Sequence, residues 1–445
     1  MFRIYQLLRL FYYPFFNWVF FVFPKINTRL KFERLNESCA HSQSFKLSSK
    51  TADICFEVSS EGELEQIRPV LMEELSSGAL VELVFASDSV KKQCSALAEE
   101  FADNLRIFRY PLLTYLPGRW WSDPLKWISA KKLVLCRYDF FPELLKYGRK
   151  KDVEFILLSG SLKNFETKSG PAKKFYSFSY HSFDKIVAAT ALDQERFEEK
   201  LGIRKSKVES FDFRPLAIEK RQAKAYETLG HRFPDFESFF RLAQEYNPRR
   251  RIVFGSFWEY ETEAFNNGFD FKNNFLCLVP HKLDDASIGS MKVKLKEKFP
   301  EQPIYEWSKD FLNNKSVAEI FFKRPGVVII NLKGVLCELY TIFGASFVGG
   351  GHGVSVHSLL EPFMAGCMVY CGPKVHRSTE YDLIIQNYPD RLRIVDRLDN
   401  VVENFESDIS TELSDITKFI KQAKNKRKAV MKWLQVGEEE TNGSI

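Results

Sequence analysis

The sequence predicts an α/β protein with two tandem, doubly wound, Rossmann-like domains. Short apolar runs alternate with amphipathic stretches through residues 53–213 and again through 251–395, and a charged stretch separates the two series. Strands that alternate with helices in this way form parallel sheets covered on both faces. The chain has 445 residues, and a single hydrophobic core rarely grows beyond about 250–300 residues. Two domains are therefore expected.

Each expected strand is a short apolar run that ends at a turn or loop signal. In the first series the runs are 52–60, 80–87, 132–139, 153–160 and 183–190, and residues 62–75 carry a helical pattern. In the second series they are 251–256, 275–280, 326–331, 345–350, 368–373 and 393–395. We expect residues 31–214 to form the first domain, 215–250 an irregular interdomain connection, and 251–415 the second domain.

The composition narrows the class of protein. A hydrophobic content of 45% with 27% charged residues indicates a folded chain. The net charge of +6 is far below that of a dedicated nucleic-acid binder, so no nucleic-acid partner is expected. The eight cysteines are scattered and form no CxxC pair, which predicts reduced thiols and argues against a zinc site.

The N-terminus carries an apolar, aromatic run at residues 7–23 with basic residues on both sides. Pro14 and Asn17 interrupt the run, and it is short for a membrane span of about 20 apolar residues. No small-residue cleavage site follows, which argues against a removed signal peptide. We expect residues 1–30 to form an uncleaved membrane anchor rather than a buried helix, with the body of the protein in the cytoplasm.

The C-terminal stretch 416–445 predicts a basic helix followed by a tail. Apolar residues recur near one helical face, and lysines and arginines cover the other; the apolar positions are Ile416, Phe419, Ile420, Ala423, Val430 and Leu434. The helix could dock on the protein with its basic side in water. The alternative is a helix that lies partly on anionic lipid.

The motif VSSEGELEQIRP, residues 58–69, lies where an expected strand meets an expected helix. Ser60 and Glu63 have the spacing of a capping box, in which the Glu63 side chain accepts a hydrogen bond from a backbone N–H. A carboxylate at the C-terminal edge of a parallel sheet also lies where α/β proteins bind ligands. There it could take a proton from a hydroxyl group. The residues alone leave both roles open.

The second domain carries three further motifs at expected strand ends. In GSFWEYETE, residues 255–263, Ser256 can cap a helix whose N–H groups could receive a phosphate. In VPHKLDDASI, residues 279–288, Pro280 and His281 end a strand. The stretch FVGGGHGVSVHSLLEPFMAG, residues 347–366, has the order strand, glycine-rich loop and helix, with a short helix expected at 356–365. This order holds phosphate in α/β folds, although a plain tight turn is the alternative.

Glu361, which follows the glycine-rich loop, could accept hydrogen bonds from a ribose diol, or it could be a surface residue beside Pro362. The sequence contains no HExxH, no acidic pair of the DxD type on a loop, and no GxSxG turn. The predicted chemistry therefore uses neither a tightly held metal nor a serine nucleophile.

Taken in this order, the motifs resemble those of the 3-deoxy-D-manno-octulosonic acid (Kdo) transferases of lipopolysaccharide synthesis, which are inverting enzymes of the GT-B fold. SSEGELEQIRP looks like the S-x-G-E segment of that family, whose glutamate is the catalytic base, and this implies a base at Glu63. YDFFPELL, residues 138–145, is similar to a segment with an acidic catalytic residue, which implies a role for Asp139. Arg214 is the nearest candidate for a basic residue of the family, one position out of register.

The resemblance also implies a nucleotide site in the second domain. GSFWEYETE, VPHKLDDASI, GVLCELYTIFGASFVGGG and HSLLEP look like the family's nucleotide-binding segments. The implied contacts are Ser256, Pro280, His281, Gly334, Val335, Leu336, Gly349, Gly350, Gly351, Ser358, Leu359, Leu360 and Glu361. Some positions depart from the family pattern: Ser358 stands where an asparagine is usual, and Arg377-Ser378 stand where Asn-Phe is common.

What the resemblance implies is a membrane-anchored glycosyltransferase at the cytoplasmic side of the bacterial inner membrane. It would move Kdo from the donor CMP-Kdo to a lipid A precursor (lipid IVA), without a metal or other cofactor. Two alternatives stay open. One is a nucleotide-sugar epimerase on the same fold, and the other is a relative that binds nucleotide or lipid without turnover.

Overall fold

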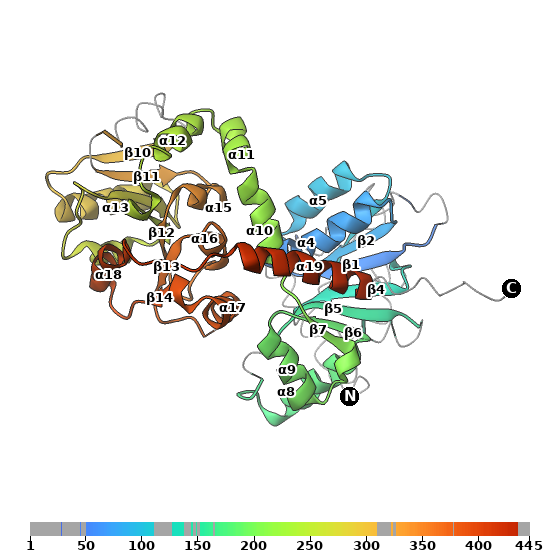
Figure 1. Cartoon of the computed structure of the whole chain (residues 1–445). Coiled ribbons are helices and arrows are strands. Elements are labelled where there is room, and N and C mark those ends of the chain that lie inside the picture. Colours follow the sequence, from blue (N-terminus) through green and yellow to red (C-terminus); the bar gives the residue numbers. More distant parts are fainter. Residues whose placement is uncertain are drawn as a thin grey trace. The chain divides into compact units, whose positions relative to one another are not determined.

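The computed structural model describes residues 50–110, 127–137, 152–162, 165–308, 326–376 and 378–434, together with residues 28, 45, 144, 145, 148, 322 and 323. The chain divides into two compact units, Met1–Arg214 with Lys426–Ile445 and Pro215–Asn425. A parallel sheet with packed helices forms the centre of each unit (Figure 1).

The first unit contains a seven-stranded parallel sheet in the order β3-β2-β1-β4-β5-β6-β7. Because β1 lies inside the sheet, the chain winds toward β3 first and then back toward β7. The strands are β1 (Ile54–Val58), β2 (Val81–Phe85), β3 (Leu105–Arg109), β4 (Lys132–Cys136), β5 (Glu154–Gly160), β6 (Lys185–Ala188) and β7 (Val208–Ser210). Their helices are α4 (Glu61–Ser76), α5 (Lys91–Glu100), α8 (Gly170–Tyr180) and α9 (Ala191–Leu201).

The second unit repeats this plan with the order β10-β11-β9-β8-β12-β13-β14. Its strands are β8 (Arg251–Phe257), β9 (Phe275–Pro280), β10 (Ile304–Ser308), β11 (Val327–Asn331), β12 (Ala345–Val348), β13 (Met368–Cys371) and β14 (Leu392–Ile394). The helical elements after them are η4 (Glu259–Phe265), α13 (Asp285–Lys298), α15 (Leu336–Leu339), α16 (Leu360–Met364), α17 (Thr379–Asn387), η7 (Leu398–Asn400) and α18 (Val401–Asp408). The predicted pair of doubly wound, parallel-sheet domains is confirmed.

Three strands, β3, β7 and β10, were not predicted, because charged residues break their apolar pattern. In β3, Arg106 lies opposite Glu82 of β2, and the two buried side chains form an ion pair. The Arg106 guanidinium also lies 4.6 Å from the ring centroid of Trp127. Buried charges are tolerated when they are paired in this way. Because they interrupt the apolar run, the strand could not be recognised from the sequence.

The stretch 215–250 is largely helical, where an irregular connection was predicted. It forms α10 (Arg214–Ala223), α11 (Ala225–Arg232) and α12 (Phe236–Ala243), and most of it packs within the second unit. The ring centroids of Phe236 and Phe239 lie 4.5 Å and 5.3 Å from that of the buried Trp307. Apolar residues recur with helical spacing among the charged residues of this stretch. The prediction of an irregular connection was wrong because it was based on the charged composition.

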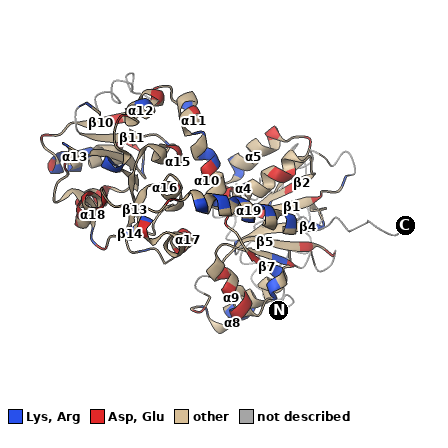
Figure 2. Ribbon diagram, viewed as in Figure 1, with Lys and Arg blue, Asp and Glu red and all other residues tan. Residues whose placement is uncertain are grey.

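The basic C-terminal stretch forms α19 (Thr417–Leu434), and its lysines and arginines lie along the helix (Figure 2). Val430, Met431 and Leu434 are buried. From Lys426 onward the helix belongs to the first unit, where Lys426 Nζ donates to Ser210 Oγ at 2.9 Å and Arg427 pairs with Glu73. The second half of the helix therefore docks on the protein, as one of the two expectations had it.

The expected anchor, residues 1–30, lies outside the described residues except for Thr28. Across the part of the chain that the structure describes, no helix combines the length and apolar character that a membrane crossing requires.

Candidate functional site

Glu63 lies in the first turn of α4, directly after β1, and its side chain is buried with 7% exposed. Ser60 is the N-cap residue, and its Oγ accepts a hydrogen bond from the Glu63 N–H at 3.3 Å. In return Glu63 Oε2 accepts from the Ser59 N–H at 2.6 Å. The predicted cap therefore forms, but the carboxylate reaches back one residue further than a standard capping box.

Basic groups share the surroundings of Glu63. The neighbouring strand β4 ends at Cys136, and burial raises the pKa of its thiol. The charge of Glu63 raises that pKa further, while Arg137 and Arg214 lower it. Because such Coulomb effects act over short distances, both arginines and Glu63 lie around this thiol. Among the predicted catalytic residues the structure thus brings Glu63 and Arg214 into one neighbourhood, and Asp139 lies outside the described residues.

Arg214 is held in place by a carboxylate that the sequence analysis missed. Its Nη2 donates to Asp212 Oδ2 at 2.7 Å, and its Nε donates to Asp212 Oδ1 at 3.0 Å. Asp212 is buried with 8% exposed. A bidentate pair of this kind fixes a guanidinium in one orientation. In the sequence, only the spacing of Asp212 and Arg214 in the segment DFR could have indicated this pair.

In the second unit, the predicted nucleotide residues converge on one edge of the sheet. Strands β11, β9, β8 and β12 are neighbours and run parallel. At or just after the carboxyl ends of these strands lie Gly334–Leu336, Pro280–His281, Ser256 and Gly349–Gly351 respectively. The winding of the chain reverses at β8, next to β12. In open α/β sheets, ligands bind at this kind of switch point.

The glycine-rich loop after β12 passes very close to the last residues of β8. A Cβ atom on Gly349 would come within 2.1 Å of the Ser256 carbonyl oxygen. Gly350 has φ of 89°, in the left-handed region that favours glycine. Ser256 itself has φ of 52°, which is uncommon for a residue with a side chain. The glycines thus allow two backbone segments to approach at the proposed site.

Three aromatic rings stack at this edge. Trp258 and His281 have ring centroids 4.2 Å apart, and His281 and His357 have centroids 4.6 Å apart. Trp258 Nε1 donates to His357 Nε2 at 3.4 Å. Burial and the charge of Lys282 lower the pKa of His281, and burial and His281 lower the pKa of His357. His281 was predicted here, whereas Trp258 and His357 were quoted only as part of their motifs.

The helix that follows the loop is shorter than expected. Instead of covering 356–365, α16 spans only Leu360–Met364. The carboxylate Oε2 of Glu380, in α17, accepts hydrogen bonds from the Ser358 hydroxyl at 3.1 Å, the Leu359 N–H at 2.7 Å and the Leu360 N–H at 3.1 Å. These are donors that the sequence assigned to the nucleotide. A phosphate at this position would have to displace the Glu380 carboxylate.

Glu361 lies near a second arginine. Gln222 Nε2 donates to the Glu361 carbonyl oxygen at 2.8 Å, and Arg221 forms a bidentate pair with Glu338, with hydrogen bonds of 3.0 and 3.1 Å. Burial lowers the pKa of Arg221, but Cys337, Glu338 and Glu361 outweigh burial and raise it. The Glu361 carboxylate is therefore close to a fixed positive charge.

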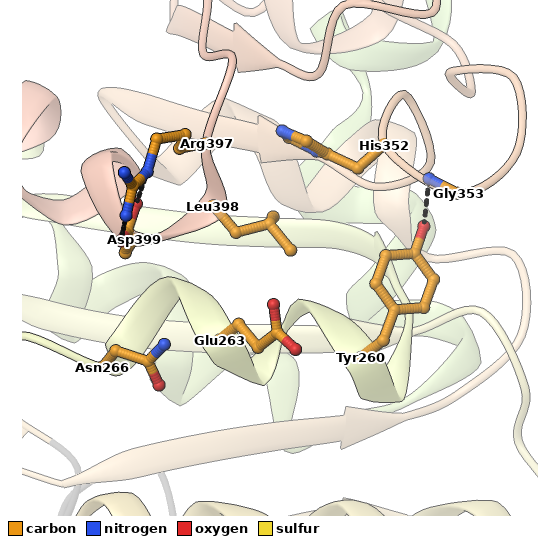
Figure 3. Close-up of a pocket in the computed structure, with 8 residues that line it drawn as sticks. All are labelled: Tyr260, Glu263, Asn266, His352, Gly353, Arg397, Leu398 and Asp399. Carbon is orange, nitrogen blue, oxygen red and sulfur yellow. Dashed lines mark hydrogen bonds and ion pairs between the residues drawn. The ribbon is translucent and has the colours of Figure 1, made fainter.

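A cavity of about 460 Å³ lies beside the glycine-rich loop (Figure 3). Tyr260 and Gly353 border it on one side, and the Gly353 N–H donates to the Tyr260 hydroxyl at 3.2 Å. On another side Arg397 pairs with Asp399. None of these residues was predicted. Over the described part of the chain, no group of three or more histidine, cysteine, aspartate or glutamate side chains could hold a metal ion.

Residues 28–212 match the family model described as 3-Deoxy-D-manno-octulosonic-acid transferase (kdotransferase). This part of the chain, which is less than half of its 445 residues, is similar to the Kdo transferases. The resemblance stated from the motifs is thus confirmed, and the glutamate after β1 lies within the matched region.

Two other kinds of similarity accompany this match. The bifunctional glycosyltransferase/methyltransferase of Fusobacterium nucleatum subsp. nucleatum is 26% identical over 247 residues, which make up 54% of this chain and 35% of that protein. The chain thus spans about a third of the length of this curated relative. The printed name of this relative, like the description of the matched family model, includes a glycosyl transfer activity.

Solved structures extend the likeness to both units. UDP-GlcNAc 2-epimerase from Neisseria meningitidis, bound to UDP-GlcNAc, covers 86% of this chain and 99% of its own, with 10% identity and a TM-score of 0.53. At that identity the likeness shows a shared, GT-B-like fold. The C-terminal CMP-Kdo binding domain of WaaA from Acinetobacter baumannii covers 49% of this chain and 99% of its own, with 16% identity and a TM-score of 0.31.

Proposed function

We propose that the protein transfers Kdo from CMP-Kdo to a lipid A precursor, with Glu63 as the general base. The observation that carries the proposal is the position of Glu63: a buried carboxylate at the carboxyl end of β1, within the stretch that matches the Kdo transferases. A base of this kind must lie at the ligand-binding edge of the sheet and be held in one orientation. The hydrogen bond from the Ser59 N–H orients it.

The reaction is one inverting displacement. Glu63 takes the proton of an acceptor hydroxyl, and the oxygen of that hydroxyl forms a bond to the anomeric carbon of Kdo. The bond between that carbon and the phosphate oxygen of CMP breaks, and CMP leaves as an anion. A carboxylate has several acceptor sites, and the Ser59 N–H uses one of those of Glu63.

On the donor side, the nucleotide is proposed to bind at the carboxyl ends of β8, β9, β11 and β12. The stacked rings of Trp258, His281 and His357 offer a flat aromatic surface there, and Lys282 supplies positive charge beside Trp258. Basic groups and backbone N–H groups would stabilise the departing CMP. We propose that they do so without a metal ion.

Two alternatives remain as outcomes of the test. The epimerase of Neisseria meningitidis shares the fold alone, at 10% identity, so its activity is not carried over to this chain. A relative without turnover would bind CMP and form no product. Incubation of the purified protein with CMP-Kdo and a tetra-acylated lipid A precursor, followed by mass spectrometry, separates a Kdo transferase from both alternatives. We expect the acceptor mass to rise by at least one Kdo, and an unchanged acceptor would contradict the proposal.

The site of action is proposed to be the cytoplasmic face of the inner membrane, because a lipid acceptor is held there. The proposal rests on the apolar run 7–23 and its basic flanks. Removal of residues 1–24 should shift the protein from the membrane fraction to the soluble fraction while CMP binding is retained. A truncated protein that still sediments entirely with membranes would contradict the anchor.

A further inference from the structure

Glu261 is a fully buried acid that the proposed reaction does not use. It lies in η4, directly after β8, with 0% of its surface exposed. Its Oε2 accepts a hydrogen bond from the Trp258 N–H at 2.8 Å, and its Oε1 accepts one from the Gly350 N–H at 2.8 Å. One carboxylate thus joins the turn after β8 to the glycine-rich loop after β12.

Tyr260 extends this connection. Its hydroxyl forms a hydrogen bond with the Glu261 carboxylate and accepts one from the Gly353 N–H at 3.2 Å. The fit is close, because a Cβ on Gly349 would lie 2.9 Å from Glu261 Oε2 and a Cβ on Gly353 would lie 2.8 Å from the Tyr260 hydroxyl. The glycine-rich loop is therefore held at Gly350 and again at Gly353.

Burying a carboxylate at this position costs free energy. Burial raises the pKa of Glu261 to about 7, against the lowering effect of the hydrogen bonds from Trp258, Gly350 and Tyr260. Within the described residues Glu261 forms no ion pair that would offset its burial. If packing alone mattered, a glutamine or an apolar side chain would be less costly. Only a carboxylate, however, presents two acceptor oxygens to two backbone N–H groups.

We propose that Glu261 is a positioning residue of the nucleotide site, whose ionised carboxylate sets the spacing between the turn that carries Ser256 and Trp258 and the loop that carries Gly349–Gly351. This inference rests on the proposed function, in that it takes CMP as the ligand of these two segments. When Glu261 is protonated, one oxygen becomes a donor that faces a backbone donor, and the two segments separate.

Other titratable groups near η4 have partners of their own. Lys294 on α13 pairs with Glu259 at 2.8 Å, Arg397 pairs with Asp399 of η7, and His352 Nε2 is hydrogen-bonded to the Val395 carbonyl oxygen at 2.8 Å. Of the groups on the elements packed against Glu261, Tyr260 is the one that acts on its pKa. A pH dependence that disappears with Glu261 can therefore be assigned to it.

The test compares Glu261→Gln with Glu259→Gln, a matched change in the same helix at a half-exposed carboxylate that pairs with Lys294. CMP affinity is measured by calorimetry at pH 8 and pH 6. We expect Glu261→Gln to bind CMP at least ten-fold more weakly than the wild type at pH 8, and the two to converge at pH 6, where the wild-type carboxylate is largely protonated. Glu259→Gln should follow the wild type at both values. The titration of CMP and of the histidines is common to all three proteins and cancels.

A second measurement does not depend on CMP. Hydrogen exchange of the peptide that contains residues 349–354 should be several-fold faster in Glu261→Gln at pH 8 and unchanged in Glu259→Gln. Tyr260→Phe, which keeps the volume and removes the hydroxyl, should speed the same exchange less.

If the wild type binds no CMP, the proposed function fails, and the exchange rates alone decide whether Glu261 positions the loop. Unchanged exchange, or a CMP affinity ratio that is the same at pH 6 and pH 8, would overturn the proposal.

Discussion

At the scale of single residues, carboxylates arrange much of the candidate site. Glu63 accepts a hydrogen bond from the Ser59 N–H, and Glu380 accepts three hydrogen bonds from residues 358–360. Glu261 connects the turn after β8 to the glycine-rich loop. The sequence could identify Glu63 and Glu361, because a chemical role could be proposed for each from its place in its motif. Glu261 and Glu380 could not be singled out, since an acid at a helix start usually serves as a simple cap. Their roles depend on donors 89 and 20 to 22 residues away along the chain.

The Glu361 carboxylate provides a prediction at this scale. If it accepts hydrogen bonds from a ribose diol, Glu361→Ala should weaken CMP binding by about 1.5–3 kcal/mol, the usual range for hydrogen bonds to a charged group. Calorimetry measures the change directly. Glu403→Ala, at an exposed carboxylate of α18, is the control and should bind CMP as the wild type does. Unaltered affinity in Glu361→Ala would refute the role given to Glu361.

At the scale of elements, the buried apolar strands were predictable and the strands with paired charges were not. Runs such as those of β8, β9 and β11 have a continuous apolar pattern, whereas β3 hides Arg106 in a pair with Glu82. The helix α16 was predicted too long. The first residues of the expected helix form part of a loop. There the Ser358 hydroxyl and the Leu359 N–H donate hydrogen bonds to the Glu380 carboxylate rather than to acceptors within a helix. Such long-range partners are not visible in local sequence.

The Glu380 carboxylate, which accepts hydrogen bonds from the residues before α16, provides a prediction at this scale. Glu380→Gln keeps the shape but offers a weaker acceptor to three donors, so the free energy of unfolding should fall by about 1–3 kcal/mol. Urea unfolding at pH 7.5 measures it. We expect CMP affinity to stay within about three-fold, because the Glu380 carboxylate belongs to the fold rather than to the ligand site. A ten-fold gain in affinity would instead mean that the phosphate of CMP takes the place of this carboxylate.

At the scale of the whole molecule, two sets of groups link stability to pH in opposite directions. Burial raises the pKa of Glu261 to about 7, well above the value of about 4.3 for a free glutamate. The folded state therefore binds this proton more tightly, and the contribution of Glu261 to stability falls as the pH rises from about 4.5 to 7. The lowered pKa values of His281 and His357 act the other way, since the folded state resists their protonation as the pH falls below about 6.5.

Glu261→Gln isolates the first of these effects. The shift of its pKa corresponds to about 3 kcal/mol across this range of pH. The free energy of unfolding of the variant, minus that of the wild type, should therefore increase with pH from about 5 to 7.5, since the histidines cancel in the difference. Urea titrations at four pH values are sufficient. A difference that does not vary with pH would contradict the raised pKa.

The division into two units with parallel sheets followed from the alternating pattern of the whole chain, and the family match for residues 28–212 agrees with the motifs. The helical stretch 215–250 did not follow, because its charged surface masks aromatic residues that pack on Trp307. The sequence pattern therefore predicted the architecture, and the motifs pointed to the proposed base, while the supporting contacts required the structure.

The central claim is that Glu63 is the base of a Kdo transfer, and Glu63→Gln tests it most directly. Glutamine can still accept the hydrogen bond from the Ser59 N–H, so the helix cap is retained. We predict that the rate of Kdo transfer from CMP-Kdo falls by roughly 10²–10⁴, while melting temperature and CMP affinity stay as in the wild type. Glu61→Gln, at the exposed acid two residues earlier, should transfer Kdo normally. Near-normal transfer by Glu63→Gln would contradict the account and leave Glu63 as a structural cap.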